Sequence, residues 1–149
     1  MNLNSVYIKT ISYGSLEHGK MLDLRQRVLR APLGLTFTKE DIEKEKNDYL
    51  ICAFIKGNDK LSGCCILTVV DKTVRLRQMA VDIIFQKKGI GSMLLSFAEE
   101  IAINDGFSAI HLHARSVSVD FYKKNGYTKT SERFIEVGIP HFAMEKKFY

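Results

Sequence analysis

The stretch Gln86-Lys87-Lys88-Gly89-Ile90-Gly91 decides how the rest of the chain is organised. It follows a strand-like run over residues 74–81, and it opens an apolar pattern of helical spacing that begins at Ile90. Two glycines separated by one residue at the start of a helix let main-chain N–H groups approach an anion, and the helix N-terminus adds roughly half a positive charge. Lys87 and Lys88 each add a whole charge. The stretch therefore predicts a binding site for a phosphate-bearing ligand.

Two familiar phosphate-binding motifs do not fit this stretch. The dinucleotide-binding fingerprint needs a third small residue where Leu94 stands, and an acidic residue at the end of the next strand, where His113-Ala114 stands. The P-loop pattern G-x-x-x-x-G-K-[ST] does not occur in the chain. A plain strand-to-helix turn that binds nothing stays open as the alternative at this point.

Composition and charge indicate a globular protein with anionic partners. Of the 149 residues 46% are hydrophobic and 26% are charged, which is enough to bury one core. The chain contains no run of 18 apolar residues, so no membrane span is predicted. Residues 1–5 lack the layout of a signal peptide, so we expect a cytoplasmic protein without a membrane partner. The formal net charge of +5 favours anionic partners. Because the basic residues are dispersed, we expect a phosphorylated small molecule rather than nucleic acid.

Hydrophobic periodicity and turn residues divide the chain into alternating strands and helices. The expected elements are a strand over 6–11, a helix capped by Ser15 and ended by residues 31–34, a polar helix over about 39–47, strands over 49–55, 61–70 and 73–81, a helix over 90–104, a strand over 109–114, a helix over 117–124, and a hairpin of 128–137 with 141–148. One strand–helix–strand unit within a mostly antiparallel sheet predicts an α+β, or mixed α/β, fold. We expect one domain over residues 1–149.

The three cysteines lie in apolar, strand-like runs. Cys64 and Cys65 are adjacent and would point to opposite faces of a strand, which suits neither a zinc site nor a disulfide framework. Together with Cys52 they are expected to be small core residues, and no metal is expected. A reactive thiol is the remaining alternative.

Two linked motifs and the order of the elements resemble the GNAT acyl-CoA N-acyltransferases. A strand that ends Met79-Ala80-Val81, followed by residues 86–91 and a helix, resembles motif A of that superfamily, R/Q-x-x-G-x-G/A. Asp120-Phe121-Tyr122-Lys123-Lys124-Asn125-Gly126-Tyr127 resembles its F-Y-x-K-x-G-F/Y segment. The resemblance runs from about residue 6 to the end of the chain. Residues 136–141 also resemble a small bacterial branch with a Gly-Ile-Pro-His close.

The resemblance implies a GNAT-like fold and an N-acetyltransferase that moves acetyl from acetyl-CoA to a primary amine of a small molecule or peptide. The peptide-like pantetheine arm of CoA would pair with the edge of the strand over 79–81, where an N–H could stabilise an oxyanion. Tyr122 would protonate the leaving thiolate, unless it only packs its helix onto the sheet. The residues implied in CoA binding are Met79, Ala80, Val81, Gln86, Lys87, Lys88, Gly89, Ile90, Gly91, Ser92 and Tyr122.

The amine must lose a proton before it attacks, and three residues are candidates for the base. They are His113 at the end of a strand, His141 in the closing hairpin, and Glu136 beside it. A histidine on a sheet face can equally be structural. We expect His18 on the solvated face of the first helix. The acids of the polar helix are also expected to be exposed, with attraction of a cationic acceptor as the alternative; they are Glu40, Asp41, Glu43, Glu45 and Asp48.

Three positions depart from the superfamily pattern. Arg115 stands seven residues before Tyr122, where an asparagine often contacts pantetheine, Ser118 replaces a usual alanine, and Gln86 replaces a basic residue. The pantetheine contacts after the fifth strand are therefore open, as are the acceptor, the acyl chain and the oligomeric state, for which a homodimer is one option. A non-catalytic CoA-binding or regulatory domain is the main alternative function. A small basic nucleic-acid-binding domain rests on net charge alone.

Overall fold

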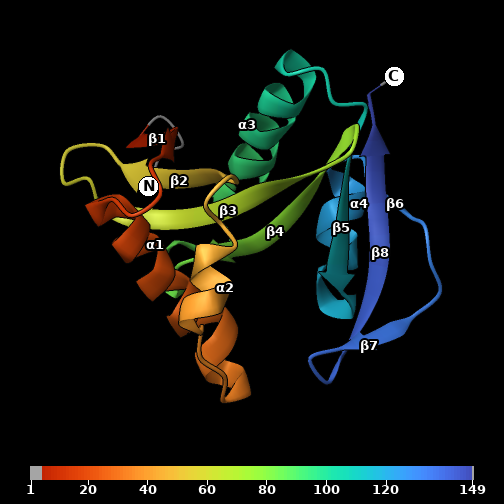
Figure 1. Ribbon diagram of the computed structural model, residues 1–149, viewed down its shortest axis with the longest axis horizontal. Coiled ribbons are helices and arrows are strands. Elements are labelled where there is room, and N and C mark those ends of the chain that lie inside the picture. Colours follow the sequence, from red (N-terminus) through yellow and green to blue (C-terminus); the bar gives the residue numbers. More distant parts are fainter. Residues whose placement is uncertain (1–4, 149) are drawn as a thin grey trace.

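The computed structural model describes residues 5–148 and arranges them as one eight-stranded mixed sheet with helices on both faces (Figure 1). The strand order is β1-β2-β3-β4-β5-β8-β6, and β7 pairs with β8. The strands are β1 (Val6–Ile11), β2 (Tyr49–Ile55), β3 (Leu61–Val70), β4 (Thr73–Val81), β5 (Ala109–Arg115), β6 (Thr128–Lys129), β7 (Phe134–Glu136) and β8 (Ile139–Lys147). The α-helices are α1 (Leu16–Arg25), α2 (Lys39–Glu43), α3 (Ile90–Asn104) and α4 (Val119–Lys124).

Helix α3 connects β4 to β5, and this is the parallel pair of the sheet; the other pairs are antiparallel. The predicted strand–helix–strand unit within a mostly antiparallel sheet is therefore confirmed. The β4–β5 ladder covers only Val74–Leu76 opposite Ile110–Leu112. Beyond it the two strands diverge, so that they lie side by side at one end and apart at the other (Figure 1).

Each face of the sheet has its own hydrophobic core. On one face α3 packs Leu94, Leu95 and Ala98 against strand residues that include Val74 and Leu76. On the other face α1 places side chains against β2 and β3; the buried members are Met21, Leu24, Leu50, Cys52, Cys64 and Ile66. Burying each leucine or isoleucine contributes about 1.5–3 kcal/mol, so both helices are held firmly.

The predicted elements are found, with differences at several boundaries. The first helix does not run on to residue 29 as one α-helix, because a π-helical turn over Gln26–Arg30 and a 3₁₀ turn over Ala31–Leu33 follow it. The polar helix ends at Glu43 rather than near 47, and the predicted strand over 128–137 divides into β6 and β7. Residues 1–4, on which the expectation about a signal peptide chiefly rests, lie outside the described residues. None of the helices within residues 5–148 is long and apolar enough to cross a membrane.

The cysteines are core residues, as predicted. Cys52, Cys64 and Cys65 are free thiols, and each is fully buried in the sheet. Burial raises the pKa of Cys64 to about 12, and it raises the pKa values of Cys52 and Cys65 as well. A thiol that stays protonated is a poor nucleophile, so these positions favour packing over reactivity.

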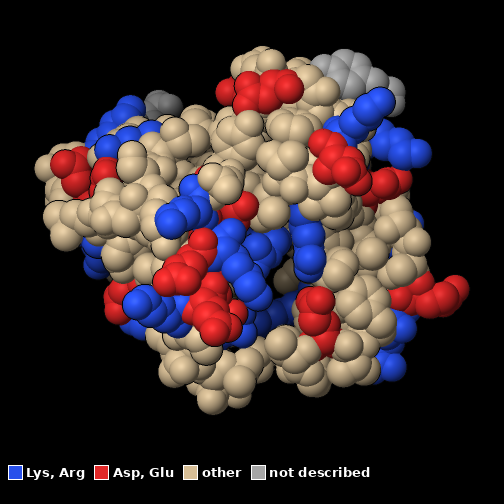
Figure 2. Space-filling model, viewed as in Figure 1, with Lys and Arg blue, Asp and Glu red and all other residues tan. Residues whose placement is uncertain are grey.

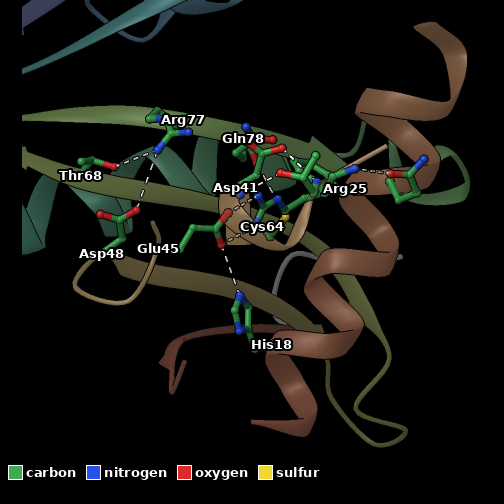
Figure 3. A network of polar contacts seen from close by, with 12 residues as sticks. His18, Arg25, Asp41, Glu45, Asp48, Cys64, Thr68, Arg77 and Gln78 are labelled. Atoms are coloured by element: carbon green, nitrogen blue, oxygen red, sulfur yellow. Dashed lines mark hydrogen bonds and ion pairs between the residues drawn. The ribbon is translucent and has the colours of Figure 1, made fainter. Parts of the chain in front are cut away.

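The predictions for His18 and Glu45 are wrong, because both side chains are buried in one network with Arg25 (Figure 3). The Glu45 carboxylate accepts hydrogen bonds from Arg25 Nη1 at 2.8 Å and Nη2 at 2.5 Å. His18 Nδ1 accepts from the Gly14 N–H at 3.0 Å, so Nε2 carries the hydrogen that faces Glu45 Oε1 at 3.3 Å. A buried guanidinium is strongly destabilising without a counter-charge, so its pairing with Glu45 holds the segment after α2 against α1. Glu40 and Glu43 are exposed as predicted, whereas the prediction for Asp48 is wrong, because only 5% of its side chain is exposed.

Candidate active site

A cleft of about 830 Å³ opens in the sheet where β4 and β5 separate. Its walls come from residues 28–33 after α1, from β4, from the end of β5 with α4, and from the hairpin of β7 and β8. Figure 2 shows this face of the molecule hollowed near its middle, with Lys and Arg side chains gathered at the hollow. The cleft thus joins segments that are far apart in the sequence.

The residues predicted to bind the co-substrate fall into two groups. Met79, Val81, Gln86 and Tyr122 line the cleft. Ala80 is buried in the core on the α1 side of the sheet, while residues 87–92 form the loop and the first turn of α3. The sequence motifs therefore converge on one region, although only part of the predicted set faces the cleft itself.

Strand β4 offers a free edge to this cleft. Its pairing with β3 shifts register between Arg77 and Ala80, and Gln78 there has a φ of 55°, which marks a bulge. The Cys64 thiol lies 3.8 Å from the Gln78 carbonyl oxygen, as a weak donor. On the side toward β5 the ladder stops at Leu76, so on that side residues Arg77 to Val81 pair with no strand of the described chain. An extended peptide-like molecule can pair with such an edge.

The glycine stretch has the geometry of an anion site. Gly89 is the N-cap of α3 with a φ of 87°, and Lys87 also has a positive φ of 62°. The Gln86 side chain donates to the Val81 carbonyl oxygen at 2.9 Å, which fixes the start of the loop against the end of β4. The first N–H groups of a helix have no partner within it, so those of Ile90 and Gly91 are available to an anion.

Gly91 brings the two sequence motifs into contact. A Cβ atom at this position would lie 3.0 Å from Cζ of Phe121, closer than ordinary packing allows. The residue before Tyr122 therefore rests directly on the first turn of α3. The glycine is needed for this close approach as well as for access of an anion to the main chain.

Tyr122 lines the cleft from α4 and is buried, with 7% of its surface exposed. Burial raises the pKa of its hydroxyl well above the ordinary value of 10.0. Its ring packs edge-on against Phe121 and Tyr127, at centroid distances of 5.0 and 5.8 Å. The phenol is held in place and stays protonated at neutral pH, as a proton donor must.

The structure brings all three base candidates together on the opposite wall. His113 Nδ1 lies 2.9 Å from Glu136 Oε1 and 3.0 Å from Arg75 Nη2. His141 Nδ1 donates to the Ile139 carbonyl oxygen at 2.8 Å, which leaves Nε2 facing Glu136 Oε2 at 3.7 Å. Partial burial acts to raise the pKa of Glu136, but the hydrogen bond from His113 and the nearby positive charges lower it. The carboxylate thus stays ionised beside His113.

Sequence reasoning missed most of the arginines of the cleft. Arg30, Arg75, Arg77 and Arg115 all line it, and only Arg115 had been singled out. The signal for two of them was the alternation Val74-Arg75-Leu76-Arg77. Since Val74 and Leu76 face α3, the arginines between and beyond them point to the other face of the sheet. Ser118, the other departure from the superfamily pattern in this region, lines the cleft too.

Comparison with known proteins gives one family. A family model described as an acetyltransferase (GNAT) domain matches residues 35–148. YjcF, an uncharacterized N-acetyltransferase of Bacillus subtilis, is 36% identical over 109 residues, which cover 72% of this chain and 77% of YjcF. YyaT, an uncharacterized protein of the same organism, is 34% identical over 79 residues, or 53% of each chain. The chain therefore spans about half the length of this relative.

Solved structures share the fold at low sequence identity. Escherichia coli ElaA superposes with a TM-score of 0.81 at 19% identity and covers 95% of this chain and 99% of its own. A GNAT family acetyltransferase from Elizabethkingia anophelis with acetyl-CoA bound has a TM-score of 0.74 at 22% identity and covers 97% of this chain and 99% of its own. The fold, the two motifs and the family model agree, and the chain belongs to the GNAT acetyltransferase family.

Proposed function

We propose that this chain transfers an acyl group, acetyl above all, from acyl-CoA directly to a primary amine of a small molecule or peptide. The observation that supports the proposal most is the free β4 edge, which shares one cleft with the buried phenol of Tyr122. A thioester laid along that edge would present its sulfur to the phenol and its carbonyl to an amine from the opposite wall. The Elizabethkingia relative of the same fold binds acetyl-CoA.

In this proposal the co-substrate follows the route that the motifs predict. Its phosphates bind the loop of Gln86, Lys87, Lys88 and Gly89 with the first turn of α3, over residues 90–92, and its pantetheine arm pairs with residues 79–81. An N–H of the same edge donates to the carbonyl oxygen as it becomes an oxyanion. Loss of one such donor typically costs about 10²–10³ in rate.

The proposed reaction is one acyl transfer coupled to proton transfers at the attacking nitrogen and at the departing sulfur. A base takes a proton from the ammonium form of the acceptor, the free amine attacks the thioester carbon, and the carbon–sulfur bond breaks. Tyr122 gives its proton to the departing thiolate, whose pKa is near 8.5, and recovers one directly or through solvent as the attacking nitrogen loses its second proton and becomes an amide. Among the base candidates we favour His113, because the ionised Glu136 beside it stabilises the imidazolium that forms.

Replacing Tyr122 tests the acid role. Tyr122→Phe is expected to lower kcat by about 10²–10⁴ while acetyl-CoA still raises the melting temperature. Tyr127→Phe is the matched control, because this buried phenol bonds Glu99 at 3.0 Å outside the cleft; it should keep kcat and lose only stability. Equal kcat in wild type and Tyr122→Phe would remove the acid role.

The wild-type chain separates this proposal from its alternatives. Thiol release in a panel of amines, amino acids and peptides is the primary assay, and EDTA should not affect it, because no metal is expected. Binding of acetyl-CoA without turnover on any amine would favour the non-catalytic CoA-binding domain. Failure to bind any acyl-CoA at millimolar concentration would sink both. Steeply salt-dependent binding of nucleic acid would instead support the third hypothesis.

The remaining expectations belong to the same proposal. We expect a cytoplasmic enzyme without a membrane or nucleic-acid partner, and a homodimer is the assembly we would look for first. Light scattering on the purified protein, with and without acetyl-CoA, measures the assembly.

A further inference from the structure

The cleft carries more positive charge than the co-substrate requires. Arg30, Arg75, Arg77 and Arg115 line it, whereas Glu136 is the one carboxylate among its described lining residues. Figure 2 shows basic side chains around the hollow, with acidic ones mostly at its rim. Arginine stays charged in proteins, so these guanidiniums must find anions or remain in water.

The anions within the protein do not balance these guanidiniums. Arg75 Nη2 contacts His113, and its distance to the nearest Glu136 oxygen is 4.0 Å, while its Nε is buried without a hydrogen-bond partner in the described chain. Arg77 Nη1 lies 3.4 Å from Thr68 Oγ1 and 3.9 Å from Asp48 Oδ2, which is a loose pair (Figure 3). The β4 arginines therefore keep donor capacity that faces the cleft.

The two outer arginines are balanced even less. The Arg30 guanidinium stacks over the Phe37 ring, 4.6 Å from its centre. Neither Arg30 nor Arg115 forms an ion pair with a carboxylate within residues 5–148. Both can therefore approach an anion that enters from solvent.

The phosphates of CoA, in the proposed binding mode, lie too far away to bind Arg75 and Arg77. Those phosphates are placed at the loop after Val81, and six residues of extended chain separate Arg75 from Val81, a distance of ~20 Å. Arg75 and Arg77 also lie on the sheet face opposite α3, whereas the loop opens at the N-terminus of α3. The arginines face the side from which the acceptor would enter.

The acidic segment does not supply a site for a cationic acceptor either. No residue from 39 to 48 lines the cleft, and the buried Glu45 is already paired with Arg25. Attraction of a polyamine by these acids therefore has no support in the arrangement of the cleft.

We propose that the acceptor carries an anionic group, a carboxylate or a phosphate, that binds Arg75 and Arg77 while its amine reaches His113 and the thioester. Arginine donates to such groups through two parallel N–H bonds, which fixes orientation as well as affinity. The acceptor class is thus an amino acid or another amine with an acidic group, rather than a polyamine. This inference rests on the proposed acyl transfer and names the substrate class of that same site.

Matched acceptor pairs test the inference. Phenylalanine is compared with phenylalaninamide, and aminomethylphosphonate with methylamine, with rates expressed per free-base amine. In wild type kcat/KM should favour the acidic member by about tenfold or more, as a lost charged hydrogen bond usually costs. The amino acid and the phosphonate together distinguish a carboxylate site from a phosphate site.

The arginine variants tie any preference to these residues. In Arg75→Gln with Arg77→Gln the preference should vanish, while the KM for acetyl-CoA changes less than about twofold. Lys44→Gln with Lys46→Gln removes the same charge from exposed positions outside the cleft and should keep the preference. If the double arginine variant does not fold, Arg77→Gln alone should still reduce the preference.

Product binding decides the matter if no acceptor in the panel is turned over. N-acetylphenylalanine should bind the wild-type protein in the presence of CoA about tenfold more tightly than its amide, and the double arginine variant should not show this difference. Equal affinities, or equal rates for acidic and neutral amines, would overturn the inference while leaving acyl transfer intact. Absence of turnover with retained anion preference would instead count against the proposed function.

Discussion

At the scale of single residues, Gly91 shows how packing and binding depend on one missing side chain. A Cβ there would lie 3.0 Å from Phe121 Cζ. Gly91→Ala should therefore displace α4 from α3 and lower the free energy of unfolding by about 1–3 kcal/mol, as overpacking does. Since Tyr122 follows Phe121, acetyl-CoA turnover should fall as well. Urea unfolding and kcat/KM for acetyl-CoA measure the two effects.

A second glycine provides the control for this substitution. Gly19 lies within α1, and a Cβ at that position would meet nothing within 4 Å. Gly19→Ala should stabilise the protein by about 0.5–1 kcal/mol, because it removes backbone freedom from the unfolded chain. The clash predicts that Phe121→Leu reduces the cost of Gly91→Ala. Full additivity of those two changes would show that Phe121 is not the obstacle.

At the scale of elements, the network of His18, Arg25 and Glu45 fixes the segment after α2 onto α1 (Figure 3). Glu45→Gln would leave the Arg25 guanidinium buried without a counter-charge, and breaking a buried pair in this way costs about 3–5 kcal/mol. Glu43→Gln makes the same change at an exposed position of α2 and should stay within about 0.5 kcal/mol of wild type. Chemical denaturation of both variants measures the difference, and equal stabilities would contradict the role of the network.

The sequence predicted the elements better than it predicted this network. Helix α3 and strands β2 to β4 follow local periodicity, and the Ser15 cap of α1 is as expected. His18 and Glu45 are buried because Glu45, which follows α2, pairs with His18 and Arg25 of α1. No local sequence pattern indicates a pairing between such distant residues. The π-helical turn after α1 was not predicted either, because it starts at Gln26, inside a run that reads as continuous helix.

The candidate site was likewise predicted only in part from the sequence. The glycine loop and Tyr122 came from motifs, and the structure places both at the end of β4 and beside its cleft. The gathering of His113, Glu136 and His141 depends on the registers in which β8 pairs with β5 and with β7, which the sequence did not specify. The arginines were missed because alternating charged residues on a strand are typical of a solvent-exposed sheet face. They line a cleft only because β5 diverges from β4, which the sequence did not indicate.

At the scale of the whole molecule, the divergence of β4 and β5 gives the two proposed substrates separate faces. In our proposal CoA binds on the side of α3 and α4, and the acceptor enters between residues 28–33 and the β7–β8 hairpin, which both contribute to the walls of the cleft. The sheet between these faces has a buried core that includes the three cysteines. Its stability is therefore linked to the protonation of those thiols.

This linkage predicts a specific loss of stability in alkali. The pKa of Cys64 is about 12 in the folded protein but near 8.5 in the unfolded chain, so above pH 9 the unfolded state binds fewer protons. Stability then falls as pH rises, by about 1.4 kcal/mol per pH unit for this thiol. Cys64→Ala should be less stable than wild type at pH 7 but lose stability less steeply between pH 9 and 10.5. Val69→Ala, an exposed site without a thiol, should keep the wild-type slope in urea unfolding, and a Cys64→Ala slope equal to it would refute the linkage.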